Sequence, residues 1–244
     1  MSEEIREANK RLNQEINGHK KITEGLKTAR DWYRSLFENM SISLWEEDFS
    51  SVKTYLDDLR KKGIEHFSEY FENNPQEVEN CVDMVRVTDI NRATLKMYKA
   101  SNKKKLLSGL SQVFTEDTYR VFQEELIALA MGRTHFESET LTRTLNGDDK
   151  YVHLTLSVAP GYQDTWKRVL LSLTDITARK QAEEELRSNH EYLEKLNNSL
   201  QEVIFRVKLP ERTIAYVNRA VRSIFGYEEE TRRAFPCRSH HHLL

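Results

Sequence analysis

Three consecutive carboxylates are the residues of this chain that most readily suggest chemistry. Glu46, Glu47 and Asp48 could hold a cation or, with His153, form a hydrolytic site in which carboxylates and an imidazole exchange protons. The three acids directly precede a predicted helix, and acidic residues are favoured at helix starts, where they meet the positive end of the helix dipole. We therefore expect an exposed strand exit with an acidic helix start, and the hydrolytic reading is the weakest for these residues.

No other pattern typical of catalysis or of a metal site occurs in the sequence. The 8 glycines form no phosphate-binding loop, and neither a histidine-kinase phosphoacceptor box nor a diguanylate cyclase signature is present. Three histidines, His240 to His242, would bind nickel or zinc in vitro as a tail segment. We predict no metal site and no enzymatic activity in this chain.

Composition bounds the partners and the compartment. The 37 basic and 39 acidic residues nearly balance and are spread along the chain, so we expect no contact with nucleic acid. Cys81 and Cys237 are far apart in sequence, which indicates no disulfide framework and suits a reducing compartment. The first residues carry no signal-peptide pattern, and no apolar run approaches the length of a membrane span. The sequence thus predicts a cytoplasmic protein with no direct membrane contact.

A short motif occurs twice in the chain. A strand pattern runs into Asn91-Arg92-Ala93 and again into Asn218-Arg219-Ala220, each time followed by a helical segment. Between the copies, another strand pattern ends in Asp175-Ile176-Thr177. The repeat predicts two related domains, of which the second, at 199–231, is too short to complete a sheet. Residues 232–244 have no amphipathic period and are expected to be a non-native tail.

Apolar residues at heptad spacing predict a long helix at 1–36 and a linking helix at 178–198. Charged and polar residues fill most flanking positions, and Glu15 and His19 interrupt the first seam. Narrow seams of this kind favour a parallel coiled coil and hence a homodimer, but one amphipathic helix folded back on its own domain also explains them. The first seam comprises Ile5, Ala8, Leu12, Ile22, Leu26, Ala29, Tyr33 and Leu36, and the second comprises Ala182, Leu186, Leu193, Leu196, Leu200 and Val203.

Between the two helices the hydrophobic period changes from 3.6 to 2. The middle of the chain predicts an amphipathic helix at 116–131, and residues 49–85 contain two or three further amphipathic helices. We therefore expect an α+β fold in which a five-stranded antiparallel sheet carries helices on one face and a helical insert, flanked by the coiled-coil helices. The predicted strands are 41–45, 85–90, 136–145, 151–158 and 166–174.

The order of these elements and motifs resembles the PAS sensor domain family with its PAC motif, as in bacterial sensor histidine kinases and diguanylate cyclases. The resemblance runs from about Tyr33 to Leu186 and places the domain at 37–177, with a second copy starting near Leu196. In the family the motif ends in Gly-Tyr, which the first copy replaces by Lys99-Ala100, so this turn must form without glycine.

The resemblance implies roles for two sets of residues. Asn91 and Asn218 would cap the helix that follows the second strand of each copy. Asp175, Ile176 and Thr177 would tie the last strand to the exit helix and carry a signal into it, although an ordinary helix cap accounts for the same residues.

Cofactors are also constrained by the resemblance. Haem sensors of the family usually take the iron ligand from the long helix, and 116–131 contains no histidine, whereas His135 and His153 lie on strands. Flavin photochemistry in the family needs a cysteine within Thr94 to Met97, and none is there. We predict no cofactor, with haem and flavin unsupported. A small molecule would lie between sheet and long helix, against residues that suit a plain core equally well: Trp45, Met97, Val121, Phe122, Leu126, Val152 and Leu154.

These observations predict the cytoplasmic PAS input module of a bacterial signal-transduction protein, in the first instance a sensor histidine kinase. Its partners would be a second copy, bound through the flanking helices, and a downstream output domain. Two alternatives remain open, the input module of a diguanylate cyclase and a ligand-free dimerisation or docking module. The helical insert at 49–85 could form a lid over a cavity or an added packing layer.

Overall fold

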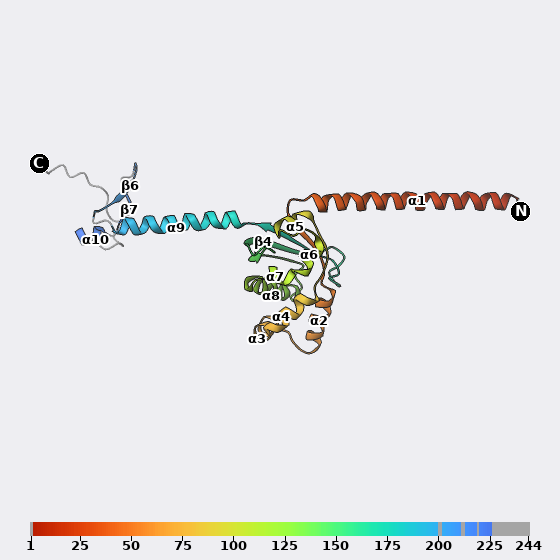
Figure 1. The fold of residues 1–244 in the computed structure, drawn as a ribbon, viewed down its shortest axis with the longest axis horizontal. Helices are drawn as coiled ribbons and strands as arrows, with labels where there is room; N and C mark the ends of the chain where they lie inside the picture. The colour runs from red at the N-terminus through yellow and green to blue at the C-terminus, as the bar shows by residue number, and fades with distance from the viewer. Residues whose placement is uncertain (1, 200–201, 211–212, 219, 226–244) are drawn as a thin grey trace. The chain divides into compact units, whose positions relative to one another are not determined.

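The computed structural model describes residues 2–199, 202–210, 213–218 and 220–225 of the chain (Figure 1). The predicted tail at 232–244 lies outside these described residues. The chain divides into two compact units, Met1–Thr177 and Ala178–Leu244. We describe each unit by itself.

The first unit is built on a five-stranded antiparallel sheet in the order β2-β1-β5-β4-β3. Its strands are β1 (Ser43–Asp48), β2 (Arg86–Ile90), β3 (His135–Arg143), β4 (Asp149–Val158) and β5 (Val169–Asp175). The last three form the predicted meander, and β1 and β2 join it through the β1–β5 pair. The predicted α+β fold with a five-stranded antiparallel sheet is confirmed.

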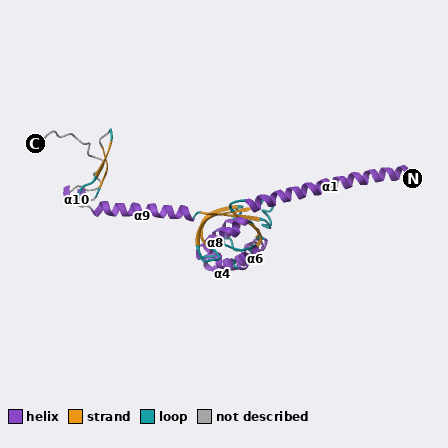
Figure 2. Ribbon diagram, turned by 45° about the horizontal axis from the view of Figure 1, so that its top comes forward, coloured by secondary structure: helices purple, strands orange, loops and turns teal. Residues whose placement is uncertain are grey.

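Helices cover one face of this sheet, and the strands curve over them (Figure 2). Alternation decides which face is covered, because Trp45, Val152 and Leu154 are buried while their chain neighbours are more exposed. The covering helices are α5 (Arg92–Met97), α6 (Lys103–Ser108), α7 (Leu110–Val113) and α8 (Glu116–Ala130). The face on the other side of the sheet holds the more polar half of each strand.

The predicted insert forms three helices between β1 and β2. They are α2 (Ser50–Lys61), α3 (Phe67–Asn73) and α4 (Pro75–Met84). Each turns its apolar side to the main core, as Leu56, Phe71 and Cys81 are fully buried there. The insert is therefore an added packing layer of the same core, and its last helix also reaches the cavity described below.

The turn after α5 forms without glycine, as the sequence requires. Lys99 takes the left-handed conformation, with φ of 55°, and the Ala100 amide donates to the Leu95 carbonyl at 2.9 Å. This conformation costs a side chain such as lysine roughly 1–2 kcal/mol.

Two long helices flank the sheet-forming segments in sequence, α1 (Ser2–Asn39) and α9 (Thr177–Ser199). Along the described part of α1 the side chains are exposed until Phe37, which is buried in the first unit. None of the described helices combines the length and the apolar character that crossing a lipid bilayer requires.

The described part of the second unit repeats the start of the first. Strands β6 (Phe205–Lys208) and β7 (Thr213–Val217) form an antiparallel pair followed by α10 (Ala220–Phe225). Phe205 pairs with Val217 as Trp45 pairs with Ile90, and the register shifts after Arg206 as it does after Glu46. Only a short link joins Lys208 to Thr213, so the three-helix insert belongs to the first copy alone.

Candidate functional site

A cavity of about 350 Å³ lies between the covered face of the first unit's sheet and its helices. The sheet supplies residues of β1 to β5, and α7 and α8 close the opposite side. The insert adds Val82 and Asp83 of α4 and Val85 just after it, so the predicted packing layer is also one wall of the cavity.

Five of the seven predicted cavity residues line it, namely Trp45, Val121, Phe122, Val152 and Leu154. Met97 and Leu126 are not among the lining residues. Leu126 is fully buried in the packed core, and Met97 packs against that core.

Two carboxyl groups, of Glu47 and Glu125, lie in the wall of this largely apolar cavity. Glu47 is 7% exposed and Glu125 3% exposed. No described residue gives either side chain a hydrogen bond or an ion pair. Buried carboxylates without protein partners are unusual, because removing an ion from bulk water costs free energy unless a hydrogen bond or an opposite charge compensates it.

Burial raises the pKa of Glu47 to about 7. Burial raises the pKa of Glu125 well above its usual value too, and the nearby charge of Glu47 raises it further. Two carboxyls in one apolar site resist double ionisation, because each charge opposes the other. Burial and mutual repulsion therefore both oppose ionisation of this pair of carboxyls.

Strand and helix geometry place these two acids. On β1 burial alternates, so Glu47 faces the cavity while Glu46 and Asp48 face the other way. On α8, Glu125 follows Val121 by four residues and Phe122 by three, which puts it on the apolar stripe.

The start of α8 is fixed to the sheet. Thr115 and Thr118 form a capping box, and the Thr118 hydroxyl donates to the Leu141 carbonyl of β3 at 2.9 Å. This attachment fixes the start of α8 on β3, and thereby the position of Glu125 relative to the strands.

Two threonines of β3 face the cavity, and they differ in whether the hydroxyl has a hydrogen-bond partner. Thr142 donates to the Val113 carbonyl at 2.9 Å and lies 3.4 Å from the Tyr98 hydroxyl. The Thr140 hydroxyl oxygen is buried and has no partner among the described residues. An unpaired buried hydroxyl lowers stability.

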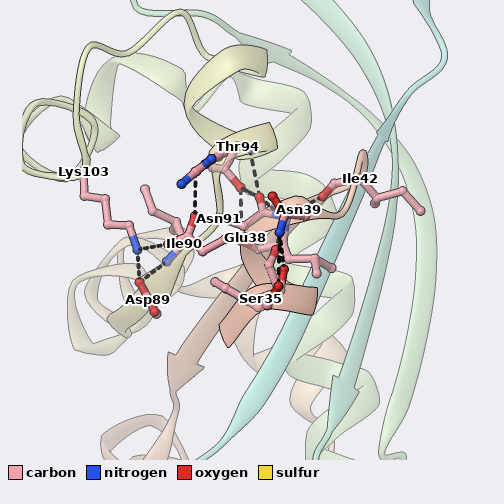
Figure 3. Close-up of polar contacts among 12 residues, drawn as sticks. Ser35, Glu38, Asn39, Ile42, Asp89, Ile90, Asn91, Thr94 and Lys103 are labelled. Atoms are coloured by element: carbon pink, nitrogen blue, oxygen red, sulfur yellow. Dashed lines mark hydrogen bonds and ion pairs between the residues drawn. The ribbon is translucent and has the colours of Figure 1, made fainter. Parts of the chain in front are cut away.

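Asn91 does more than the predicted capping. Its Oδ1 accepts from the Thr94 amide at 3.0 Å, which caps α5, and also from the Leu44 amide of β1 at 3.1 Å. Its Nδ2 donates to the Phe37 carbonyl at 3.0 Å and to the Ile42 carbonyl at 2.9 Å. Figure 3 shows this side chain between the end of α1 and the start of α5. One buried amide thus holds α1 to the sheet.

Charged contacts reinforce the same junction. Lys103 of α6 pairs with Asp89 and lies 3.4 Å from a Glu38 carboxylate oxygen of α1 (Figure 3). On the outward side of β1, the Tyr33 hydroxyl of α1 donates to Glu46 Oε1, and Arg168 donates to the same oxygen at 2.6 Å. The Arg168 guanidinium also lies 5.4 Å from the centre of the Tyr33 ring.

Asn218 repeats the arrangement within the second unit. Its Oδ1 accepts from the Ile204 amide at 3.0 Å, and its Nδ2 donates to the Asn197 carbonyl of α9 at 3.0 Å and to the Glu202 carbonyl at 2.8 Å. The bond to the first turn of α10 comes from its backbone carbonyl, which accepts from the Val221 amide at 3.3 Å.

The predicted signal-transfer residues all bind the start of β4. The Ile176 amide donates to the Tyr151 carbonyl at 2.9 Å, and Thr177 Oγ1 accepts from the Tyr151 amide at 3.1 Å. Asp175 accepts from the Thr177 amide at 3.0 Å and pairs with Lys150. Partial burial works against ionisation of Asp175, but the hydrogen bonds from Lys150 and Thr177 outweigh it and lower its pKa.

The first unit combines three features: the sheet order β2-β1-β5-β4-β3, an asparagine at the end of the second strand, and an exit helix whose start is bound to β4. The first unit has the PAS fold. The structure is similar to a domain of a sensory box sensor histidine kinase/response regulator from Geobacter sulfurreducens, at 17% identity over 63% of this chain and 99% of that chain, with a TM-score of 0.38.

Two further solved structures show the same likeness. A PAS domain from Colwellia psychrerythraea is 11% identical, covers 62% of this chain and 98% of its own, and has a TM-score of 0.41. A LOV protein from Rhodobacter sphaeroides is 16% identical, covers 67% of this chain and 76% of its own, and has a TM-score of 0.42. No protein-family model and no curated protein sequence matches the chain.

The other residues that could take part in chemistry do not form a common site. Asp48 pairs with Arg86 at 2.8 Å, and Glu46 is engaged by Tyr33 and Arg168, so neither shares a site with His153. No three potential metal ligands cluster among the described residues. The expected exposed strand exit is wrong for Glu47, which is buried in the PAS cavity.

Sequence reasoning missed Glu125, although its spacing from Val121 and Phe122 was a usable signal. A lone acid on the apolar face of a predicted helix marks a buried carboxyl. His135 and His153 do not line the cavity, and His135 instead binds Ser157 and Glu137 at 2.9 Å each.

Replacing the unpaired hydroxyl should stabilise the PAS unit. We expect Thr140→Val to raise the free energy of unfolding by about 1 kcal/mol, because it removes a buried polar atom without changing the side chain's shape. Urea unfolding followed by circular dichroism measures the change. Thr142→Val is the matched control and should lower stability, since it strands the Val113 carbonyl; a loss of stability in both variants would contradict the assignment of Thr140.

The raised pKa of Glu47 should make stability depend on pH. Its native pKa lies above its unfolded value, so its contribution is complete below about pH 4.5 and is lost as pH rises through 7. Between pH 5 and pH 8 the wild-type chain should lose roughly 2–3 kcal/mol that Glu47→Gln does not lose. Urea unfolding of both proteins across this range measures the difference. Parallel profiles would show that Glu47 is ionised in the folded protein throughout. The other titratable groups of the cavity are Asp83, Tyr98, Tyr119 and Glu125.

Proposed function

We propose that this chain is the cytoplasmic sensory input module of a bacterial signalling protein, a sensor histidine kinase, and that the state of the PAS cavity changes how the core holds its flanking helices. The observation that carries the proposal is the placement of two adjacent residues of β1. Glu47 faces the cavity, and Glu46 binds Tyr33 of α1. A shift or twist of β1 would therefore move both Glu47 in the cavity and Glu46, which binds α1.

A second route leads toward α9. Val152 and Leu154 of β4 line the cavity, and the backbone of Tyr151 beside them binds Ile176 and Thr177 at the start of α9. Movement of β4 would therefore displace the first residues of the exit helix. Packed cores of this kind respond to a ligand by changing between discrete arrangements rather than by deforming continuously.

The downstream partner in this proposal is an output domain reached through the second repeat. Asn218 binds the end of α9 in the second unit as Asn91 binds the end of α1 in the first. In this proposal, the junction between an incoming helix and an asparagine carries the signal into each of the two units. A sensor histidine kinase is the parent that the motif resemblance favours, and free, buried Cys81 suits a reducing cytoplasm.

A change confined to the cavity should be felt at both helix junctions. We expect Glu47→Gln in the full chain to change amide hydrogen exchange in residues 33–39 and 175–180 by roughly threefold or more at pH 7.5, where wild-type Glu47 is largely ionised. Hydrogen exchange read by mass spectrometry measures both segments. Glu124→Gln is the matched control, because Glu124 is exposed beside Glu125 on α8 and should leave both junctions unchanged. Changes limited to β1 and α8 would refute the relay.

We propose further that α1 mediates a parallel homodimer. Leu12, Ile22 and Leu26 of its heptad seam are 53%, 62% and 68% exposed, whereas Tyr33 near the end of the helix binds Glu46 of β1. A second copy supplies the same seam in the same register, which is the occupant that a heptad pattern fits.

Sedimentation equilibrium of the full chain tests the dimer. We expect a dimeric mass for the wild type at micromolar concentration and a monomeric mass for Leu26→Arg, because a charge at a seam position faces its copy in the partner. Glu24→Arg changes the outer side of the same helix turn and should remain dimeric. A monomeric wild type, or a dimeric Leu26→Arg, would rule out the seam as the interface.

A further inference from the structure

We propose that the PAS cavity binds a small organic cation, an amine carried on an apolar body, with the charged nitrogen between the carboxyls of Glu47 and Glu125. The inference rests on the proposed sensory function, because it names the ligand class of that same cavity. Three independent properties of the cavity support it: the sign of its charges, the lack of internal partners for those charges, and its aromatic walls.

The charges that line the cavity are all of one sign. Glu47, Asp83 and Glu125 are the ionisable acids, and none of the described residues that line it is a lysine, arginine or histidine. Asp83 is exposed, so its carboxylate lies at the solvent side of the cavity. Burial raises the pKa of Tyr119, and the nearby charges of Glu79 and Asp83 raise it further. A low-dielectric cleft lined by one sign concentrates ions of the opposite sign.

The two deep carboxyls are hydrogen-bond acceptors that no described residue engages. Glu47 and Glu125 are more than nine-tenths buried, face the cavity, and bind no described residue. An ammonium group supplies the missing donors and a compensating charge, and charge-assisted hydrogen bonds of this type are among the strongest in proteins. Neutral ligands satisfy the acceptors but leave a carboxylate charge uncompensated, and anions bring a further negative charge to the site.

Aromatic rings make up much of the remaining wall. Trp45 and Tyr98 meet edge to face at 5.7 Å between ring centres, and Phe49 and Phe122 lie 6.4 Å apart. Ring faces attract organic cations and also bury an apolar body. A bare metal ion fits less well, because the described residues bring no three ligands together. The volume of about 350 Å³ suits a small molecule.

Titration calorimetry with the full chain at pH 8 tests the ligand class. The probes are 2-phenylethylammonium, benzylammonium and cyclohexylmethylammonium, each compared with its neutral alcohol or hydrocarbon isostere and its carboxylate isostere. We expect the ammonium ions to bind roughly tenfold or more tightly than their neutral isosteres and the carboxylates not to bind. Binding near pH 7 should release protons, because a cation favours the ionised carboxyls. Calorimetry in buffers of different ionisation enthalpy measures that release.

Matched variants assign the effect to the two acids. Glu47→Gln and Glu125→Gln should each weaken ammonium binding by roughly 10- to 100-fold and leave the neutral isosteres within about threefold, because only the charge-assisted bonds are lost. Glu124→Gln should bind like the wild type. Two different variants guard against one that fails to fold, and circular dichroism checks both.

The outcomes separate this inference from the proposed function. Equal or tighter binding of the neutral or anionic isosteres would overturn the cation assignment and leave a ligand-sensing cavity in place. Binding of no probe in any set would also overturn it, and the sensory function would then stand or fall on the exchange at residues 33–39 and 175–180 alone. Ammonium binding without any change in those segments would support the cation site and refute the relay.

Discussion

The structure of each unit depends on one buried asparagine. Asn91 is fully buried, and its single amide binds the end of α1, the turn before β1, β1 itself and the first turn of α5. No other side chain offers two donors and a two-lone-pair acceptor in this shape, since aspartate cannot donate and glutamine is longer. Asn218 repeats three of these side-chain bonds to residues at matching places, and β6–β7 repeats the register shift, so the junction occurs in both units.

The alternation of side chains along β1 gives neighbouring residues different roles. Neighbouring side chains must face opposite sides of the sheet, so a cavity residue and a helix-binding residue are adjacent in sequence, as Glu47 and Glu46 are. Sliding the strand by one residue would exchange their sides, and the Asn91 bonds to Leu44 prevent such a slip. The interaction that anchors α1 therefore also decides which acid enters the cavity.

Much of this architecture was readable from the sequence, and the exceptions have physical reasons. Alternation located all five strands and periodicity located the insert, because burial in these elements follows local geometry. The run Glu46-Glu47-Asp48 suggested an exposed strand exit, yet Glu47 is buried in the wall of the cavity on the covered face of the sheet. The bonds from Asn91 to Phe37 join distant segments, and no local pattern encodes such a contact. Apolar side chains at a cavity and in a packed core look alike in sequence, so no pattern separates Met97 and Leu126 from the residues that line the cavity.

The cavity is a place where the first unit gives up stability. A cavity of about 350 Å³ forgoes packing contacts, and the burial of Glu47 and Glu125 costs free energy that no described residue compensates. A molecule that fills the space and pairs the acids restores both losses, and it does so only in the folded state, so the binding free energy adds to the stability of the liganded arrangement. That energy is delivered at β1 and β4, the two strands whose outward bonds hold α1 and the start of α9. A site that is costly when empty and lies on the strands that grip both helices can turn binding into a change of helix position, whereas a filled core has no such free energy to release.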